Sequence, residues 1–97
     1  MSGEVVHFEI PVDDPERATA FYTGAFGWNA QSMPDMGYTL VSTGPATESG
    51  SPAAPGHING GMMKRQDAYQ HPIITIGVDD IDEALRAVSD LGGTTER

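Results

Sequence analysis

The feature that most constrains the fold is an internal repeat with a displacement of 66 residues, the separation of residue 10 from residue 76. Sliding the chain by this distance aligns Ile10 with Ile76, Val12 with Val78, Asp13-Asp14 with Asp79-Asp80, Ala18 with Ala84 and Gly27 with Gly93. Each copy has the same order: an apolar strand, an acidic pair that can cap a helix, an amphipathic helix and a terminating glycine. We therefore expect two related strand–helix units.

The first copy begins with a strand over residues 4–10. Side chains alternate along it, so Val6, Phe8 and Ile10 share one face while Val5, His7 and Glu9 share the other. Residues 13–27 predict a helix that Asp13 or Asp14 caps, with Pro15 in its first turn and Gly27 as its end. Its apolar stripe is expected in the core and consists of Ala18, Phe21, Tyr22, Ala25 and Phe26.

Three further strands are expected before the second copy. They cover residues 28–33, 37–44 and 57–64, and the Gly60-Gly61 pair in the last one indicates a bulge or a close backbone approach. Residues 44–56 are rich in Gly, Pro, Ser and Ala, which predicts a mobile loop.

The second copy predicts a buried strand over 73–78 and a helix over 79–93. Asp80 caps this helix, and its stripe consists of Ile81, Ala84, Leu85, Val88 and Leu91. Only four residues follow Gly93, too few for the three strands that follow the first helix. We expect either a second copy of the chain or a further C-terminal segment to complete the sheet.

The composition excludes several classes of function. Fourteen acidic against five basic residues give a net charge of −9, which disfavours nucleic acid and anionic membranes as partners. Without cysteine, disulfides, thiolate catalysis and cysteine-based zinc sites are impossible. The chain also lacks a signal-peptide pattern and an apolar run of the roughly 20 residues that a membrane helix needs. We expect one small cytoplasmic domain.

Several stretches resemble the vicinal-oxygen-chelate superfamily, which includes glyoxalases, bleomycin-resistance proteins and extradiol dioxygenases. They are "VVHFEIPVDDPERATAFYTGAFGW", "GYTLVSTGP", "INGGMM" and "VDDIDEALRAVSDLGG", and they are most similar to glyoxalase-like proteins of actinobacterial type. The resemblance implies an α+β fold of paired βαβββ modules around a cavity. Residues 1–97 would form one domain, with 1–66 as the first module and 72–97 as a second module truncated after its helix.

The resemblance also implies a site for a divalent metal ion in the metal-dependent members, with His, Gln or Glu ligands from symmetry-related strands. His7 matches the first-strand ligand position. Its repeat equivalent is Ile73, and the strand over 37–44 supplies no carboxylate, so the ligand set is incomplete in this sequence. The expected cofactor is therefore either none or a divalent metal ion bound at His7.

His7 and Glu9 are the candidate catalytic residues, since both point to one side of the first strand and can exchange protons. The alternative is that His7 is a cavity-wall histidine bonded to Glu9. Trp28, Tyr38 and Met62 are candidate ligand-binding residues, with simple packing as their alternative role. The two aspartate pairs are explained as helix caps.

Two functions remain open at this point. The first is an enzyme, lactoylglutathione-lyase-like or related to the dioxygenases, that acts as a lyase or isomerase on a small oxygenated molecule in a sheet-lined cavity. The second is non-catalytic sequestration of a drug-like small molecule between two subunits, for which the acidic chain would suit a cationic ligand. An accessory domain with neither role is a third possibility. A homodimer is expected in either of the first two cases.

Overall fold

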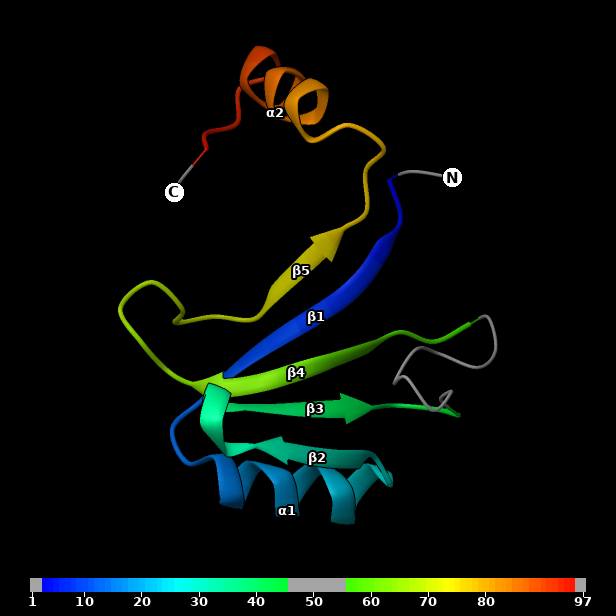
Figure 1. Ribbon diagram of the computed structural model, residues 1–97, viewed down its shortest axis with the longest axis vertical. Helices are drawn as coiled ribbons and strands as arrows, with labels where there is room; N and C mark the ends of the chain where they lie inside the picture. Colours follow the sequence, from blue (N-terminus) through cyan, green and yellow to red (C-terminus); the bar gives the residue numbers. More distant parts are fainter. Residues whose placement is uncertain (1–2, 46–55, 96–97) are drawn as a thin grey trace.

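The computed structural model describes residues 3–45 and 56–95 (Figure 1). Its elements are β1 (Val5–Val12), α1 (Pro15–Phe26), β2 (Asn29–Met33), the short 3-10 helix η1 (Pro34–Met36), β3 (Tyr38–Ser42), β4 (Asn59–Lys64), β5 (Ile73–Ile76) and α2 (Ile81–Asp90). The predicted α+β class and the predicted order of strands and helices are confirmed. The expected mobile loop falls mostly outside the described residues.

The strands form one sheet of five in the order β2-β3-β4-β1-β5. β1 lies between β4, to which it runs parallel, and β5, to which it runs antiparallel. The β2–β3 and β3–β4 pairs are antiparallel. This order separates β3 from β1 by the whole width of β4, a spacing that decides how the side chains of the site can meet.

Both helices begin at a predicted aspartate cap, and α1 ends at the predicted glycine, whereas α2 ends at Asp90 with Leu91 as its C-cap. The Asp14 side chain accepts a hydrogen bond from the backbone N–H of Arg17 at 3.2 Å, and Asp80 accepts one from Glu83 at 3.1 Å. Gly27 ends α1 with a φ of 73°, in the left-handed region that glycine enters without strain. Within residues 3–45 and 56–95, neither helix is long and apolar enough to cross a membrane.

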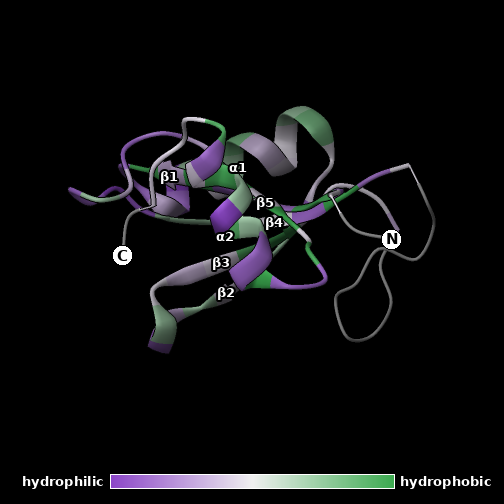
Figure 2. Ribbon diagram, turned by 90° about the horizontal axis from the view of Figure 1, so that it is seen from above, coloured by the Kyte–Doolittle hydropathy of each residue, from purple (hydrophilic) through white to green (hydrophobic). Residues whose placement is uncertain are grey.

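The core lies between α1 and the face of the sheet beneath it. Figure 2 shows α1 to one side of the strands. The buried hydrophobic side chains are Val12, Val41 and Met62, and the side chains packed against them are Phe8, Ile10, Ala18, Tyr22 and Trp28. Each fully buried side chain of this size contributes about 1.5–3 kcal/mol to stability, so this small cluster is the main source of cohesion in the first module.

Neither copy is buried as fully as the sequence predicts. Phe21 of α1 is 58% exposed and Ile74 of β5 is 60% exposed, while Phe26 and Ile76 are also exposed. The expectation that these residues form core is wrong in this structure. For Ile74 and Ile76 the reason is that neither helix of the described residues lies over β5. α2 lies beyond the end of β5, away from the sheet (Figure 1), and none of the residues Ile81–Asp90 is buried.

Candidate functional site

The candidate site lies on the face of the sheet opposite α1. Along β1, Phe8 points toward the core, so His7 and Glu9 point to the other side, as the alternation predicts. The β1–β4 register pairs Glu9 with Gly61, and the β3–β4 register pairs Gly61 with Leu40. Glu9, Gly61 and Leu40 are therefore neighbours across three strands.

Tyr38 starts on β3 and reaches β1 by crossing over Gly61. A Cβ atom added to Gly61 would lie only 1.8 Å from the Tyr38 hydroxyl oxygen and 1.9 Å from the ring carbon that bears it. No side chain larger than hydrogen fits under this ring. Tyr38 can therefore reach His7 and Glu9, two strands away, only because the β4 residue beneath its ring is a glycine.

The hydroxyl of Tyr38 joins His7 and Glu9 into one polar cluster, which we call the triad. Tyr38 donates a hydrogen bond to Glu9 Oε2 at 2.8 Å, and His7 Nε2 lies 2.9 Å from the Tyr38 oxygen. His7 Nε2 also lies 3.3 Å from Glu9 Oε1. Burial, and secondarily the hydrogen bond and negative charge of Glu9, raises the pKa of Tyr38 far above its ordinary value. The phenol is therefore protonated throughout the physiological range.

The direction of these hydrogen bonds fixes the tautomer of His7. The single proton of Tyr38 goes to Glu9, so the proton between His7 and the Tyr38 oxygen must come from Nε2. A neutral imidazole with its hydrogen on Nε2 leaves Nδ1 as an acceptor, and no described residue bonds to Nδ1. The triad thus holds the ring through one nitrogen and leaves the other available to a ligand.

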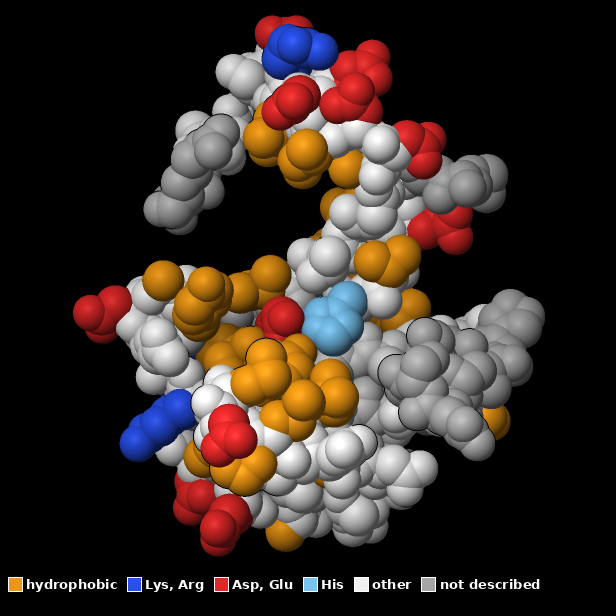
Figure 3. Space-filling model, viewed as in Figure 1, with side chains coloured by type: hydrophobic (Ala, Val, Ile, Leu, Met, Phe, Trp, Pro, Cys, Tyr) orange, Lys and Arg blue, Asp and Glu red, His pale blue; other side chains and the backbone are white. Residues whose placement is uncertain are grey.

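The triad is partly open to solvent. The side chains of His7 and Glu9 are 32% and 24% exposed. Figure 3 looks onto this face and shows a histidine beside an acidic side chain near its centre, with hydrophobic side chains on both sides. By register, the apolar neighbours on this face are Leu40, Met63 and Ile73. A few polar groups on an apolar surface are typical of small-molecule sites.

Two of the predicted ligand-binding residues do not join the triad. Met62 is fully buried in the core under α1, and Trp28 stacks on Tyr22 in the same layer at a centroid distance of 4.7 Å. Both therefore lie on the α1 side of the sheet. Gly61 is the site residue that sequence reasoning did not identify, although the glycine pair did indicate a close approach.

The described residues do not by themselves fit a metal centre. Among residues 3–45 and 56–95, no three His, Asp or Glu side chains gather closely enough to hold an ion. His7 Nε2 and Glu9 are also bonded to Tyr38, so an ion at that nitrogen would have to displace the tyrosine. Three protein ligands are the usual minimum for a catalytic zinc site. A metal at His7 stays a prediction.

Comparison with known proteins places the chain in a family. A family model described as bleomycin resistance protein-like N-terminal matches residues 4–44, which include all three triad residues. A glyoxylase-like domain-containing protein of Didymella fabae is 34% identical over 97 residues, which cover 96% of this chain and 71% of that protein. The chain therefore belongs to the glyoxalase-like, or vicinal-oxygen-chelate, superfamily.

Proposed function

We propose that the chain binds a small oxygenated molecule on the face opposite α1 and that His7 transfers a proton in the bound state. The single observation that carries this proposal is the orientation of His7. Its Nε2 is held by Tyr38 and Glu9, while Nδ1 has no hydrogen-bond partner among residues 3–45 and 56–95. A base held at one nitrogen by a carboxylate and open at the other is suited to general acid–base catalysis.

Each triad residue has a distinct task in this reaction. Nδ1 of His7 takes a proton from the ligand, and Glu9 stabilises the imidazolium that results because its Oε1 lies 3.3 Å from Nε2. Tyr38, which stays protonated, holds the Glu9 carboxylate in place through the 2.8 Å hydrogen bond. A carbon-bound proton next to a carbonyl group is the kind of proton that such a base can remove, which favours lyase or isomerase chemistry.

The experiment follows solvent deuterium entering α-hydroxycarbonyl compounds. Glycolaldehyde, glyceraldehyde and dihydroxyacetone are incubated with the protein in D₂O, and loss of the C–H signal is measured by proton NMR. We expect exchange faster than in buffer, reduced about 100-fold or more by His7→Asn, in line with general base catalysis. His71→Asn is the matched control, since His71 lies exposed outside the triad. Exchange at the buffer rate with all three compounds would contradict proton transfer.

A second candidate function is sequestration of a cationic small molecule. Glu9 forms no ion pair with Lys or Arg among the described residues, and the chain carries a net charge of −9. Thermal shift measurements with a panel of cationic drugs and uncharged analogues test this alternative. A shift that is specific to the cations and lost in Glu9→Gln would support sequestration. Absence of both exchange and thermal shifts would favour an accessory domain.

A metal ion, a homodimer and a cytoplasmic location stay predictions of the sequence. Metal analysis of the purified protein tests the first, because stoichiometric Ni, Zn, Fe or Mn that is lost on His7→Ala would place an ion at the triad. Size-exclusion chromatography with light scattering tests the second. Both measurements are independent of the deuterium-exchange assay.

A further inference from the structure

The face of the sheet opposite α1, which we call the triad face, has a polar part and an apolar part. The β1–β5 register pairs His7 with Thr75 and Glu9 with Ile73. Directly paired residues of antiparallel strands point to the same face, with Cβ atoms about 4.5–5.5 Å apart. His7 therefore has a hydroxyl group beside it, whereas Glu9 has an apolar side chain beside it.

Thr75 is available to a ligand. It is exposed, and its hydroxyl group has no hydrogen-bond partner within residues 3–45 and 56–95. The β1–β4 register places Asn59 on the other side of His7, but Asn59 is buried and accepts a hydrogen bond from the backbone N–H of Thr43 at 3.1 Å. A hydroxyl group can both donate and accept hydrogen bonds. Of these two polar neighbours of His7, Thr75 is therefore the one that can bind an oxygen atom of a ligand.

The apolar part of the triad face borders Glu9. Met63 of β4 pairs with Pro11 of β1, and Pro11 lies two positions after Glu9 in the same strand, so these side chains share the face. Met63 and Ile73 are both partly buried, which leaves some of each side chain open to a ligand. A methionine side chain adapts to the shape of an apolar group that packs against it. An apolar group next to the reacting atoms would thus be removed from water here.

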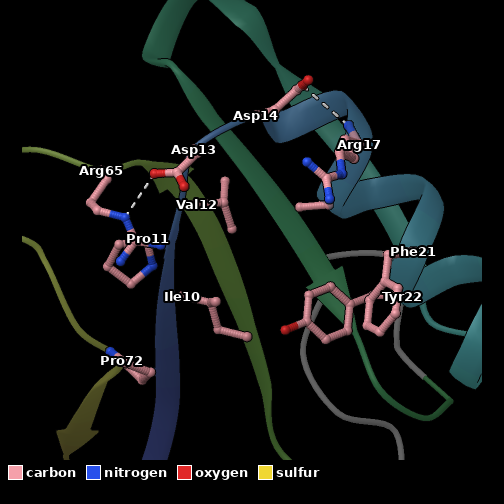
Figure 4. A pocket seen from close by; sticks show the side chains of 11 residues that line it. Ile10, Pro11, Val12, Asp13, Asp14, Arg17, Phe21, Tyr22, Arg65 and Pro72 are labelled. Atoms are coloured by element: carbon pink, nitrogen blue, oxygen red, sulfur yellow. Dashed lines mark hydrogen bonds and ion pairs between the residues drawn. The ribbon is translucent and has the colours of Figure 1, made fainter.

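The triad face carries no positive charge. In the five strands, the positions that face this side hold neither Lys nor Arg. The described cationic side chains are Arg17 on α1, Lys64 on the core-facing side of β4, Arg65 after it and Arg86 on α2. Figure 4 shows Arg17 and Arg65 at a groove on the α1 side that contains none of the triad residues. With Glu9 on the triad face and a net charge of −9 on the chain, an anionic ligand would be repelled.

We propose that the triad face selects an uncharged α-hydroxycarbonyl compound that carries an apolar group, and that Thr75 binds its carbonyl oxygen. This inference rests on the proton transfer proposed for His7 and adds the class of the ligand. When Nδ1 of His7 takes the proton from the carbon atom, the electron pair of the C–H bond moves to the carbonyl oxygen. The Thr75 hydroxyl donates a hydrogen bond to the negative charge that develops there, and the apolar group packs on Ile73 and Met63.

Three ketones that share the hydroxyacetyl group test the selection. It is attached to a phenyl ring in 2-hydroxyacetophenone, to a carboxylated phenyl ring in 4-(hydroxyacetyl)benzoate and to a hydroxymethyl group in dihydroxyacetone. In the deuterium-exchange assay, kcat/KM relative to the buffer rate should be at least about tenfold higher for 2-hydroxyacetophenone than for either of the others. Equal acceleration of all three would overturn this inference alone. The buffer rate with all three would overturn the proposed proton transfer as well.

Two adjacent isoleucines provide a matched pair of variants for the apolar contact. Ile73 and Ile74 follow each other in β5 and therefore face opposite sides of the sheet. Ile73→Ser should lower the preference for 2-hydroxyacetophenone over dihydroxyacetone at least about fivefold, whereas Ile74→Ser should leave it unchanged. The preference is a ratio measured on one preparation, so partial loss of folded protein does not alter it. Equal preferences in the two variants would overturn the packing of the apolar group on Ile73.

Replacement of Thr75 separates hydrogen bonding from packing. Thr75→Val removes the hydroxyl group but keeps the size and the branched shape that suit a strand. It should lower kcat for 2-hydroxyacetophenone at least about tenfold with little change in KM, and Thr75→Ser should recover most of the rate because the hydroxyl group is restored. A purely structural role would show the opposite order, since serine fills less space than valine. The wild-type kcat in Thr75→Val would overturn the role of Thr75.

Discussion

Replacement of Gly61 by alanine should separate Tyr38 from His7 and Glu9 without removing any triad residue. The new methyl carbon would lie 1.8 Å from the Tyr38 hydroxyl oxygen, far inside van der Waals contact. The clash is with the far end of a side chain, so the ring can rotate away while the β4 backbone stays in place. The strand is thus expected to survive, and the hydrogen bonds of the hydroxyl group are lost.

The cost follows from the two contacts of that hydroxyl. A hydrogen bond to a charged group such as Glu9 contributes about 1.5–3 kcal/mol, and one between neutral groups about 0.5–1.5 kcal/mol. Water can form hydrogen bonds in place of the lost hydroxyl group and so offsets part of this loss in free energy, because the side chains of His7 and Glu9 are 32% and 24% exposed. Within a strand, alanine stabilises the folded state by about 0.5–1 kcal/mol relative to glycine, which offsets a further part of the loss. We expect the free energy of unfolding at pH 7, measured in urea, to fall by about 1–2 kcal/mol.

The pH dependence of stability gives a second reading of the same change. Because the pKa of Tyr38 is raised in the folded state, the unfolded chain loses this proton first as the pH rises past about 10. The stabilisation is therefore complete below pH 10, and above it the free energy of unfolding falls by up to about 1.4 kcal/mol per pH unit. Gly61→Ala and Tyr38→Phe should both lack this part of the slope.

A double-mutant cycle tests whether the clash with the Tyr38 ring causes the loss of stability in Gly61→Ala. In a Tyr38→Ala background no ring crosses β4, so Gly61→Ala should be neutral or slightly stabilising there. Equal destabilisation by Gly61→Ala with and without the Tyr38 ring would refute the reasoning, since it would show that the methyl group disturbs the backbone. In the deuterium-exchange assay, the same variant should lower the rate if Tyr38 positions Glu9.

Two further predictions concern the scaffold. Met62→Ala should lower the free energy of unfolding, measured in urea, by about 2–5 kcal/mol because Met62 is fully buried. Met36→Ala is the control and should change it by no more than about 0.5 kcal/mol, because that side chain is exposed. Similar values for both variants would contradict the position of the core. Gly27→Ala should destabilise the protein by about 1 kcal/mol, because the φ of 73° at this position is unfavourable for alanine. Gly24→Ala, inside α1, is the control and should raise the midpoint of thermal unfolding. A higher midpoint for Gly27→Ala would contradict the left-handed end of α1.

Local features of the sequence predict local structure well in this chain. Asp14 and Gly27 mark the ends of α1 because a cap depends only on residues three or four positions away. Alternation likewise places His7 and Glu9 on one face of β1. Burial does not follow from such patterns, because an apolar stripe is buried only where another layer covers it. Phe21 and Ile74 have the pattern of core residues and are exposed, and for Ile74 the reason is that neither helix of the described residues lies over β5.

The bridge formed by Tyr38 depends on strand order, which sequence periodicity does not contain. Tyr38 and Glu9 are 29 residues apart and meet only because β4 lies between β3 and β1 and has a glycine at the crossing point. The Gly60-Gly61 pair indicates that something approaches closely, but not which side chain. Tyr38 was predicted as a ligand-binding residue, whereas its contacts make it a partner of the two predicted catalytic residues.

The adjacent methionines show how one position decides between core and site. Met62 pairs with Ile10 of β1 and points into the core, while Met63 pairs with Tyr38 of β3 and points to the triad face. Successive strand residues face opposite sides, so a register error of one residue exchanges their roles. Trp28 precedes β2, where alternation gives no direction, and its stacking on Tyr22 places it with α1. On this sheet the packed core and the triad occupy opposite faces, so Met63, not Met62, is the methionine on the face where we propose that a ligand binds.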